Sequence, residues 1–394
     1  MSAPTQAPAQ GKNAPPPRPY PFPVGVYENT VQDLDAVVAL GGTIAAWTAP
    51  VLLTQWNISP TGWLRGAWLN FALSITGNAA GAFAADGPWS FIQRITLYDL
   101  GGEVVFQVTG YEWMVINKYG GYFEVGDPRA DISNTFAATT TLPFQFSLFL
   151  PLEVVARDAL GTVQNESKPG WRIEVYADSA ANTVGTGGTP FTGAGVPSVR
   201  VRGYLDSYTE PAASAPNGRM FSQTPPLPGS LQYWKSENQS LPAGTAKYDL
   251  TNGIGFPIRN VIYYVKDAGN GTRATADANW PDPATVLLGN VTLRSIAKFL
   301  WISKMGKDFG QAALGATTPA VDTAQGRENG VFPMYFTKDM GLLPGGELRF
   351  KYLDTQVNSL LRITGSFGGT VTFFALSNWL ATPDRNRYSL IAGG

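Results

Sequence analysis

Short segments in which apolar and polar residues alternate recur along most of the 394-residue chain. The stretch from Trp63 to Leu73 is one of them, and clusters of Gly, Pro, Asn and Asp separate it from its neighbours. Alternation with a period of two is typical of strands that bury one face. Further segments of this kind lie at residues 91–98, 103–108, 144–150, 171–176, 199–204, 260–265, 348–352, 359–364 and 370–375. Many short strands separated by turns predict an all-β chain built from sandwiches or jelly rolls.

Two segments have the spacing of an amphipathic helix instead. Residues 110–121 place aromatic and aliphatic side chains three positions apart and end in two glycines, and residues 293–306 carry an apolar stripe that ends in Lys304 and Gly306. Apolar positions at this spacing with Gly at the end predict a helix with one buried face. A shorter helix is expected at residues 152–160.

The two longer helices belong to an internal duplication. Each half of the chain has a strand, a Gly-rich turn, a helix and then further strands in the same order, at an offset of roughly 170 residues. The equivalent segments that we predict are 92–99 with 258–267, 108–109 with 291–292, 144–151 with 331–337, 171–176 with 348–352, and 198–211 with 369–383. The repeated order predicts two tandem eight-stranded jelly rolls, each with an inserted helix.

Composition shifts along the chain predict the domain limits. Residues 1–26 are biased towards Pro, Ala and Gln, which is typical of an extended arm, and residues 212–230 have the Pro, Ser and Gly content of a linker. The first jelly roll is therefore expected at 27–211 and the second, with a C-terminal tail, at 231–394. Residues 177–197 and 311–327 are expected to form long loops.

The surface composition is unusual for a free-standing domain. Charged residues are 14% of the chain, against roughly 25% in soluble domains, while aromatic residues are 12%. Aromatic side chains dominate the energetics of interfaces as well as cores, so this balance favours a subunit that buries its exterior against other chains. The formal net charge of −1 and the absence of a basic run argue against direct nucleic-acid binding.

Two absent residue types narrow the chemistry further. The chain contains no Cys and no His, which excludes disulfides, thiol nucleophiles, Ser-His-Asp triads and most zinc or iron sites. Only carboxylate chemistry or oxygen-ligated calcium would remain. We predict no catalytic, cofactor-binding or metal-ligating residue, and we expect no signal peptide and no membrane-spanning stretch.

At this point the sequence resembles the double-jelly-roll major capsid proteins of tailless icosahedral, tectivirus-like phages. The resemblance rests on residues 92–121, where a strand ends in a Tyr-Asp turn before a helix led by Thr-Gly, and on residues 148–165, where an apolar strand precedes Pro-Leu. It implies a homotrimer whose six barrels form a pseudo-hexagonal capsomer of a virus shell. The implied partners are further capsomers and the penton and minor capsid proteins.

The resemblance also implies a location in the virion after assembly in the host cytoplasm. The N-terminal arm would then run along the inner face of the shell, next to an internal membrane. Lys12 and Arg18 are the only basic residues of that arm, so strong attraction to anionic lipid is not expected.

Two other functions remain open from the residues alone. In a two-domain carbohydrate-binding protein, exposed aromatic side chains would stack on sugar rings, and the candidates are Trp280, Trp234 and Tyr233. In a glycosidase two carboxylates would act as a pair. The candidates for that pair are Asp127, Asp131, Asp158, Glu166 and Glu328, each of which we expect to be a turn former or a solvated charge.

Overall fold

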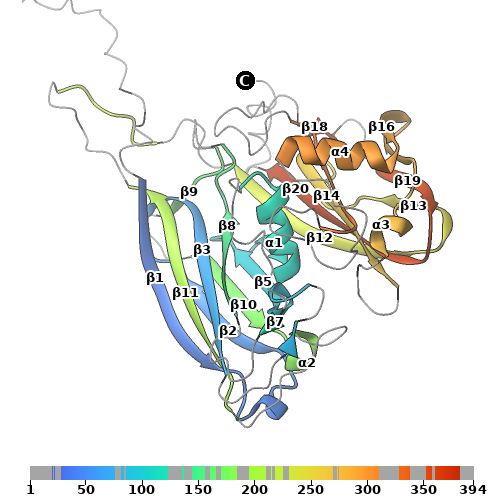
Figure 1. The fold of residues 1–394 in the computed structure, drawn as a ribbon. Helices are drawn as coiled ribbons and strands as arrows, with labels where there is room; N and C mark the ends of the chain where they lie inside the picture. Colours follow the sequence, from blue (N-terminus) through green and yellow to red (C-terminus); the bar gives the residue numbers. More distant parts are fainter. Residues whose placement is uncertain are drawn as a thin grey trace, which may run out of the picture.

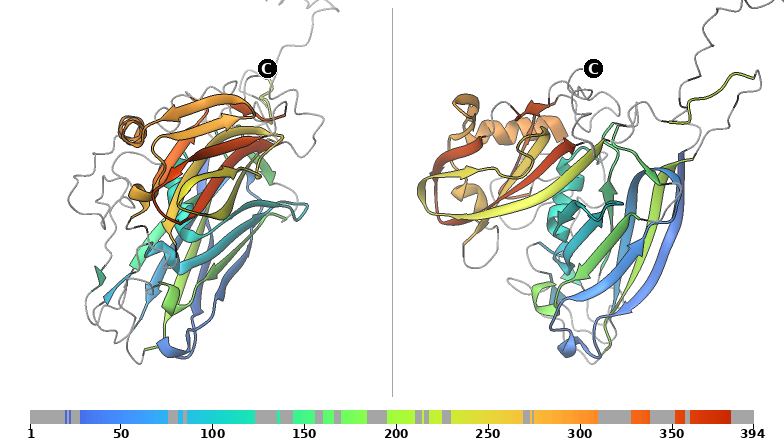
Figure 2. Two further views of the ribbon diagram at one scale, coloured as in Figure 1. Left: turned by 90° about the vertical axis from the view of Figure 1, so that its right-hand side faces the viewer. Right: turned by 180° about the vertical axis from the view of Figure 1, so that it is seen from behind.

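The computed structural model describes most of the predicted strands and both of the longer helices. The described residues are 20, 22, 28–75, 81–83, 86–122, 135–136, 144–155, 160–165, 170–183, 195–209, 214, 218–224, 230–268, 273, 275–309, 328–337, 352–356 and 360–381. Their backbone forms two packed β-barrels side by side, with a helix between them (Figures 1 and 2). The all-β prediction is confirmed.

The first barrel consists of two facing sheets. One has the strand order β1-β11-β3-β8, with the short β9 beside β3, and the other has the order β6-β5-β10-β2. The main strands that follow one another in sequence therefore alternate between the two sheets, except β5 and β6, which pair with each other, and this is the jelly-roll arrangement. The bounds are β1 Glu28–Ala39, β2 Val51–Asn57, β3 Gly62–Ser74, β5 Ile92–Tyr98, β6 Val104–Val108, β8 Phe144–Pro151, β9 Val163–Asn165, β10 Arg172–Ala177 and β11 Ser198–Tyr208.

The second barrel repeats this topology strand for strand. Its sheets have the orders β17-β14-β20-β12, with the short β18 beside β14, and β13-β19-β15-β16. The strand orders match when β12 takes the place of β1, β13 of β2, β14 of β3, and β20 of β11. The bounds are β12 Leu231–Leu241, β13 Gly244–Asp249, β14 Pro257–Asp267, β15 Ala284–Leu288, β16 Val291–Ile296, β17 Val331–Tyr335, β18 Leu353–Asp354, β19 Leu361–Phe367 and β20 Val371–Ala381.

Short elements complete the described fold. Each barrel carries one long helix between its fifth and sixth main strands, α1 in the first barrel and α4 in the second. The bounds are α1 Gly110–Tyr119 and α4 Lys298–Phe309, with short turns at η1 Ile44–Ala46, η2 Trp89–Phe91, α2 Ala180–Thr183 and α3 Ala276–Asn279, and a small pair of strands, β4 Gly81–Ala82 and β7 Thr135–Phe136. No helix among these described residues is long and apolar enough to cross a membrane.

The helix predictions are correct in one case and need correction in two. The helix expected at 110–121 is confirmed as α1, but the one expected at 293–306 begins only at Lys298. Leu293 and Ile296 belong instead to β16, which pairs with β15 and gains ladder hydrogen bonds that a helix would forgo. The helix expected at 152–160 is wrong over residues 152–155, which are not helical, and Val155 forms a bridge with Leu160.

The duplication itself is confirmed, but several of the predicted equivalents are wrong. The strand at 258–267 is β14, whose place in the first barrel is that of β3 and not of 92–99. The equivalent of β10 is β19 and not 348–352, of which only residue 352 is described. Strands of similar apolar content look alike in sequence, and only the hydrogen-bonded order separates them. The pairs β8 with β17 and β11 with β20 are as predicted.

Most of the predicted arm, linker and long loops lie outside the described residues. Tyr20, from the predicted arm, forms a parallel bridge with Phe221 in the predicted linker. Phe22 packs against Trp63 and Tyr208 of the first barrel. The end of the arm therefore lies on the same edge of the first barrel as part of the linker.

Candidate functional site: the seam between the two barrels

The two barrels share a continuous sheet. Strand β6 of the first barrel pairs in parallel with β12 of the second, Phe106 opposite Trp234 and Gln107 opposite Lys235, and this joins their sheets into nine strands. Helix α1 lies beside this junction, between the two barrels (Figure 2). We call the contact formed by α1, β6 and the sheet β12-β20-β14 the seam.

Helix α1 is buried along its whole length. All ten of its residues are buried, including its polar ones. Thr109 caps the helix by accepting from the Glu112 amide while the Glu112 carboxylate accepts from the Thr109 amide, a reciprocal arrangement that satisfies two free donors. Gly110 opens the helix against η2, where a Cβ would lie 2.2 Å from the Trp89 carbonyl oxygen. Thr109 and Glu112 therefore fix the start of the helix, and the missing side chain of Gly110 lets the helix pack closely against η2.

Both ends of α1 meet polar groups from the second barrel. At the N-terminal end, the Glu112 carboxylate accepts from the hydroxyls of Ser236 on β12 and Tyr264 on β14. At the C-terminal end, the buried guanidinium of Arg259 donates to the Gly120 carbonyl over 3.0 Å. An anion at a helix N-terminus and a cation at its C-terminus both interact favourably with the helix dipole. The second barrel thus supplies Arg259 at the C-terminal end of α1 and hydrogen-bonds the Glu112 carboxylate at its N-terminal end.

Two ion pairs cross the seam. Lys118 of α1 donates to Glu328, which comes just before β17, and the Tyr119 hydroxyl donates to the same carboxylate. The side chains of Lys118 and Glu328 are 5% and 2% exposed. Buried charges are tolerated only when paired and hydrogen-bonded, so each barrel holds a charge that the other must satisfy.

The second ion pair lies at the other end of the seam. Asp86 of the first barrel accepts from Lys266 over 2.6 Å and from Arg273 over 2.9 Å, both of them from the second barrel. Burial raises the pKa of the Asp86 carboxyl, but the attraction of Arg273 and Lys266 outweighs burial and leaves that pKa below its ordinary value. The carboxylate is therefore charged and paired near neutral pH.

The aromatic residues proposed for sugar stacking do not form a binding face. Trp280 is buried in the second barrel, stacked on Phe332 at 4.0 Å between ring centroids. Trp234 is buried in the seam, and the half-buried Tyr233 stacks on Trp379. Two of the three rings therefore have no face that a sugar could reach, which contradicts the carbohydrate-binding hypothesis at these residues.

Of the carboxylates proposed for a glycosidase, Glu328 is the one that lies within the described residues. Glu328 is a buried ion-pair partner, and the expectation of a turn former or solvated charge was wrong for it. Asp127, Asp131, Asp158 and Glu166 lie outside the described residues. The other charged residues of the seam, among them Asp86 and Arg259, were not predicted from the sequence, because no local pattern distinguishes a buried charge from a surface charge.

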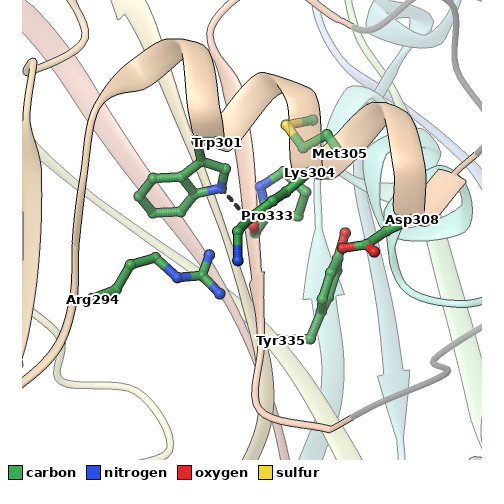
Figure 3. Close-up of a pocket in the computed structure, with 7 residues that line it drawn as sticks. All are labelled: Arg294, Trp301, Lys304, Met305, Asp308, Pro333 and Tyr335. Atoms are coloured by element: carbon green, nitrogen blue, oxygen red, sulfur yellow. Dashed lines mark hydrogen bonds between the residues drawn. The ribbon is translucent and has the colours of Figure 1, made fainter.

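A pocket of about 320 Å³ lies between α4 and the strands beside it (Figure 3). It is lined by Arg294, Trp301, Lys304, Met305, Asp308, Pro333 and Tyr335. The Arg294 guanidinium lies 5.0 Å above the Trp301 ring, and burial lowers the pKa of that guanidinium. Asp308 is the single carboxylate among the described residues of this lining, so these residues do not supply the carboxylate pair of glycoside hydrolysis. Within the described ranges no group of three Asp, Glu, His or Cys residues could hold a metal ion.

The seam and the two barrels define a class of fold, the double jelly roll. Solved structures with this fold cover nearly the whole chain. The crystal structure of the STIV MCP, from Sulfolobus Turreted Icosahedral Virus, matches with a TM-score of 0.57 and 12% identity over 91% of this chain and 98% of that one. The major capsid protein P2 from Bacteriophage PM2 matches with a TM-score of 0.50 and 12% identity over 91% and 99%.

A third similar structure is PBCV-1 VP54, with a TM-score of 0.50 and 12% identity over 90% of this chain and 93% of that one. All three are major capsid proteins of double-jelly-roll viruses. No family model matches the sequence, and no curated protein matches it either. At 12% identity the likeness establishes the fold, and the chain has the double-jelly-roll fold of these capsid proteins.

Proposed function

We propose that this chain is the major capsid protein of a tailless icosahedral virus, and that three copies form a pseudo-hexagonal capsomer of six barrels. The observation that carries the proposal is the seam, which joins two equivalent barrels into one body through a shared sheet and buried ion pairs. A shell subunit needs its two barrels at a fixed angle so that neighbouring copies can pack identically.

The coverage of the structural neighbours supports this proposal. More than 90% of the STIV and PM2 capsid proteins is matched, so no large part of either is missing here. The low charged fraction and high aromatic content suit extensive subunit contacts. We also propose that the role is structural and not enzymatic, because the neighbours are structural proteins and the chain has no His and no Cys.

The proposed domain limits follow the sequence. The arm would comprise residues 1–26, the first jelly roll 27–211, the linker 212–230, and the second jelly roll with its tail 231–394. The described sheets run from Glu28 to Tyr208 and from Leu231 to Ala381, which supports these limits.

The proposed partners are other copies of the chain, penton proteins and minor capsid proteins, in a virion assembled in the host cytoplasm. We propose that the N-terminal arm runs along the inner face of the shell, above an internal membrane. With Lys12 and Arg18 as its only cations, the arm would contact lipid without strong electrostatic attraction.

Light scattering on the purified chain tests the trimer. The expected mass is three times the 42.2 kDa of the chain, at all concentrations above the dissociation constant. Electron micrographs of the same sample should show particles of hexagonal outline. A monomer at every concentration, with no ordered assembly, would overturn the proposed function.

A further inference from the structure

Helices α1 and α4 are equivalent residue by residue. The fourth residue of each is a tryptophan, Trp113 and Trp301, and each indole N–H donates to a backbone carbonyl of the following strand, at Phe149 and Pro333. Each indole also contacts the strand residue that lies four positions before the helix, Phe106 in β6 and Arg294 in β16. Position 106 therefore corresponds to 294, and the two residues that follow Gly110 correspond to Phe299 and Leu300.

The equivalent faces of the two helices differ in burial: the face on α1 is covered and the face on α4 is exposed. On α1, Tyr111 and Glu112 are buried against Tyr264 and other residues of the second barrel. On α4, Phe299 is 71% exposed and Leu300 is 39% exposed. Apolar side chains exposed together at the place where an equivalent helix is covered indicate an unfilled contact.

The edge strands of the two barrels differ in the same way: one equivalent pair is joined and the other is not. β6 continues into the second barrel through β12, whereas β16, its equivalent, ends its sheet with no strand beside it among the described residues. β1, the equivalent of β12, likewise ends its sheet in the described structure, and its Val31 and Val37 are exposed. An unpaired edge offers a row of free N–H and C=O groups to another chain. The chain thus carries both halves of a second seam, one on each barrel.

The sheet that would receive α4 has a matching surface. Glu112 of α1 accepts from Tyr264 and from Ser236, and Ser236 belongs to the row Ser236-Leu376-Ile262-Pro333 across the second barrel. Its equivalent across the first barrel, read from the strand pairing, is Gln32-Tyr204-Trp68-Phe149. The side chains of Tyr204, Trp68 and Phe149 are half-buried, and the Trp68 and Phe149 rings lie 4.9 Å apart. This row therefore offers an aromatic surface where the seam offers an aliphatic one.

We propose that a second copy of this chain completes the second seam: β1 of one copy lies parallel to β16 of the next, and Phe299 and Leu300 dock on the Tyr204-Trp68-Phe149 row. The inference rests on the proposed trimer and names its interface. The contact joins different faces of identical chains, so it is heterologous, and it closes into a ring when the rotation between copies allows it. Three copies would alternate internal and intermolecular seams around one ring.

The pairing register follows from the internal seam. Gln107 of β6 lies opposite Lys235 of β12 there. Ser295 of β16 is the equivalent of Gln107. Val31 of β1 is the equivalent of Lys235, because Val31 pairs with Leu205 of β11 as Lys235 pairs with Ser377 of β20. Neighbouring strands lie about 4.8 Å apart, within the Cα range that a disulfide bridges. Ser295 and Val31 are both exposed, so we expect cysteines there to preserve the fold of the monomer.

Cysteine cross-linking tests the register, since the natural chain has no Cys. The test variant combines Ser295→Cys with Val31→Cys, and the register control combines Ser295→Cys with Val37→Cys. Gln107→Cys with Lys235→Cys is the positive control, in which the bond forms within one chain. Each variant is oxidised and run on a non-reducing gel, while light scattering before oxidation records the mass of the assembly. We expect the test variant to give covalent dimers and trimers and the register control to give far fewer.

The outcomes separate this inference from the proposed function. Trimers in solution without cross-links in the test variant, while the positive control closes, would overturn the interface and leave the capsid role standing. Cross-links that extend well beyond three chains would support the strand pairing and contradict the closed trimer. Monomers without cross-links would overturn both.

Discussion

Lys118 and Glu328 illustrate how single residues hold the two barrels together. Each side chain is almost completely buried, and each comes from a different barrel. Replacing Lys118 by Met removes the Lys118 ammonium from the buried Glu328 carboxylate, and we expect this to lower the free energy of unfolding by about 3–5 kcal/mol. Urea denaturation monitored by tryptophan fluorescence measures the change.

The exposed ion pair of Arg200 with Asp35 provides a matched control. It has the same charges in a similarly close contact on the surface of the first barrel, where solvent screens it. Arg200→Met should therefore change the unfolding free energy far less than Lys118→Met. Similar losses in the two variants would show that the seam pair does not hold the barrels together.

Asp86 should make the stability of the protein sensitive to acid. The pKa of its carboxyl is lowered in the folded state below the ordinary value of 3.8, so the folded protein binds fewer protons than the unfolded chain as the pH falls towards and below that value. The stability that Asp86 contributes is therefore fully present above about pH 5 and is lost as the pH falls through the folded-state pKa.

Comparison with Asp86→Asn isolates this contribution. The difference in unfolding free energy between the natural chain and the variant, measured in urea at pH 7, 5 and 3, should be largest at pH 7 and 5 and smaller at pH 3. A difference that stays constant with pH would contradict the assignment of a charged, paired Asp86.

At the scale of elements, α1 depends on a close approach that only glycine permits. A Cβ at Gly110 would overlap the Trp89 carbonyl oxygen of η2, which belongs to the backbone and cannot rotate away. We expect Gly110→Ala to destabilise the protein by about 1–3 kcal/mol although Ala favours helix, because the overlap outweighs the helix propensity. Thermal unfolding of Gly42→Ala serves as the control, since a Cβ at Gly42 meets nothing within 4 Å. Equal midpoints for both variants would contradict this reading.

Helix α4 should govern association and not folding. Phe299→Asp places a charge on the proposed contact, so we expect the trimer mass to fall to that of the monomer while the midpoint of thermal unfolding of the monomer is unchanged. Val196→Asp is the control, because Val196 is also an exposed apolar residue but lies outside the proposed contact. Trimers that persist in Phe299→Asp would count against the α4 contact.

The two helices also show how far sequence patterns reach in this chain. Helix α1 could be predicted because its aromatic spacing and its terminal glycines point to the same bounds. Helix α4 was placed about five residues too early because Leu293 and Ile296 fit a helical stripe as well as a strand with a bulge, and pairing with β15 decides between them. The seam charges could not be predicted, because their partners lie more than a hundred residues away in sequence, as Lys118 does from Glu328.

At the scale of the whole molecule, the duplication determines what the chain can build. One junction between equivalent barrels is closed inside the chain by β6 and β12, and the equivalent groups of β16 and β1 remain at sheet edges in the described structure. The repeated order of segments predicted two barrels, but the strand orders were needed to show which strands correspond. That correspondence turns a similarity of fold into a specific expectation for the contact between copies.

An image of the assembled particle at near-atomic resolution tests the capsid role most directly. Cryo-electron microscopy of the expressed chain, or of the particle that contains it, should show capsomers of three chains whose six barrels surround a pseudo-six-fold axis, with intramolecular and intermolecular seams alternating. Particles without this chain in their shell, or a chain that remains monomeric under every condition, would contradict the account.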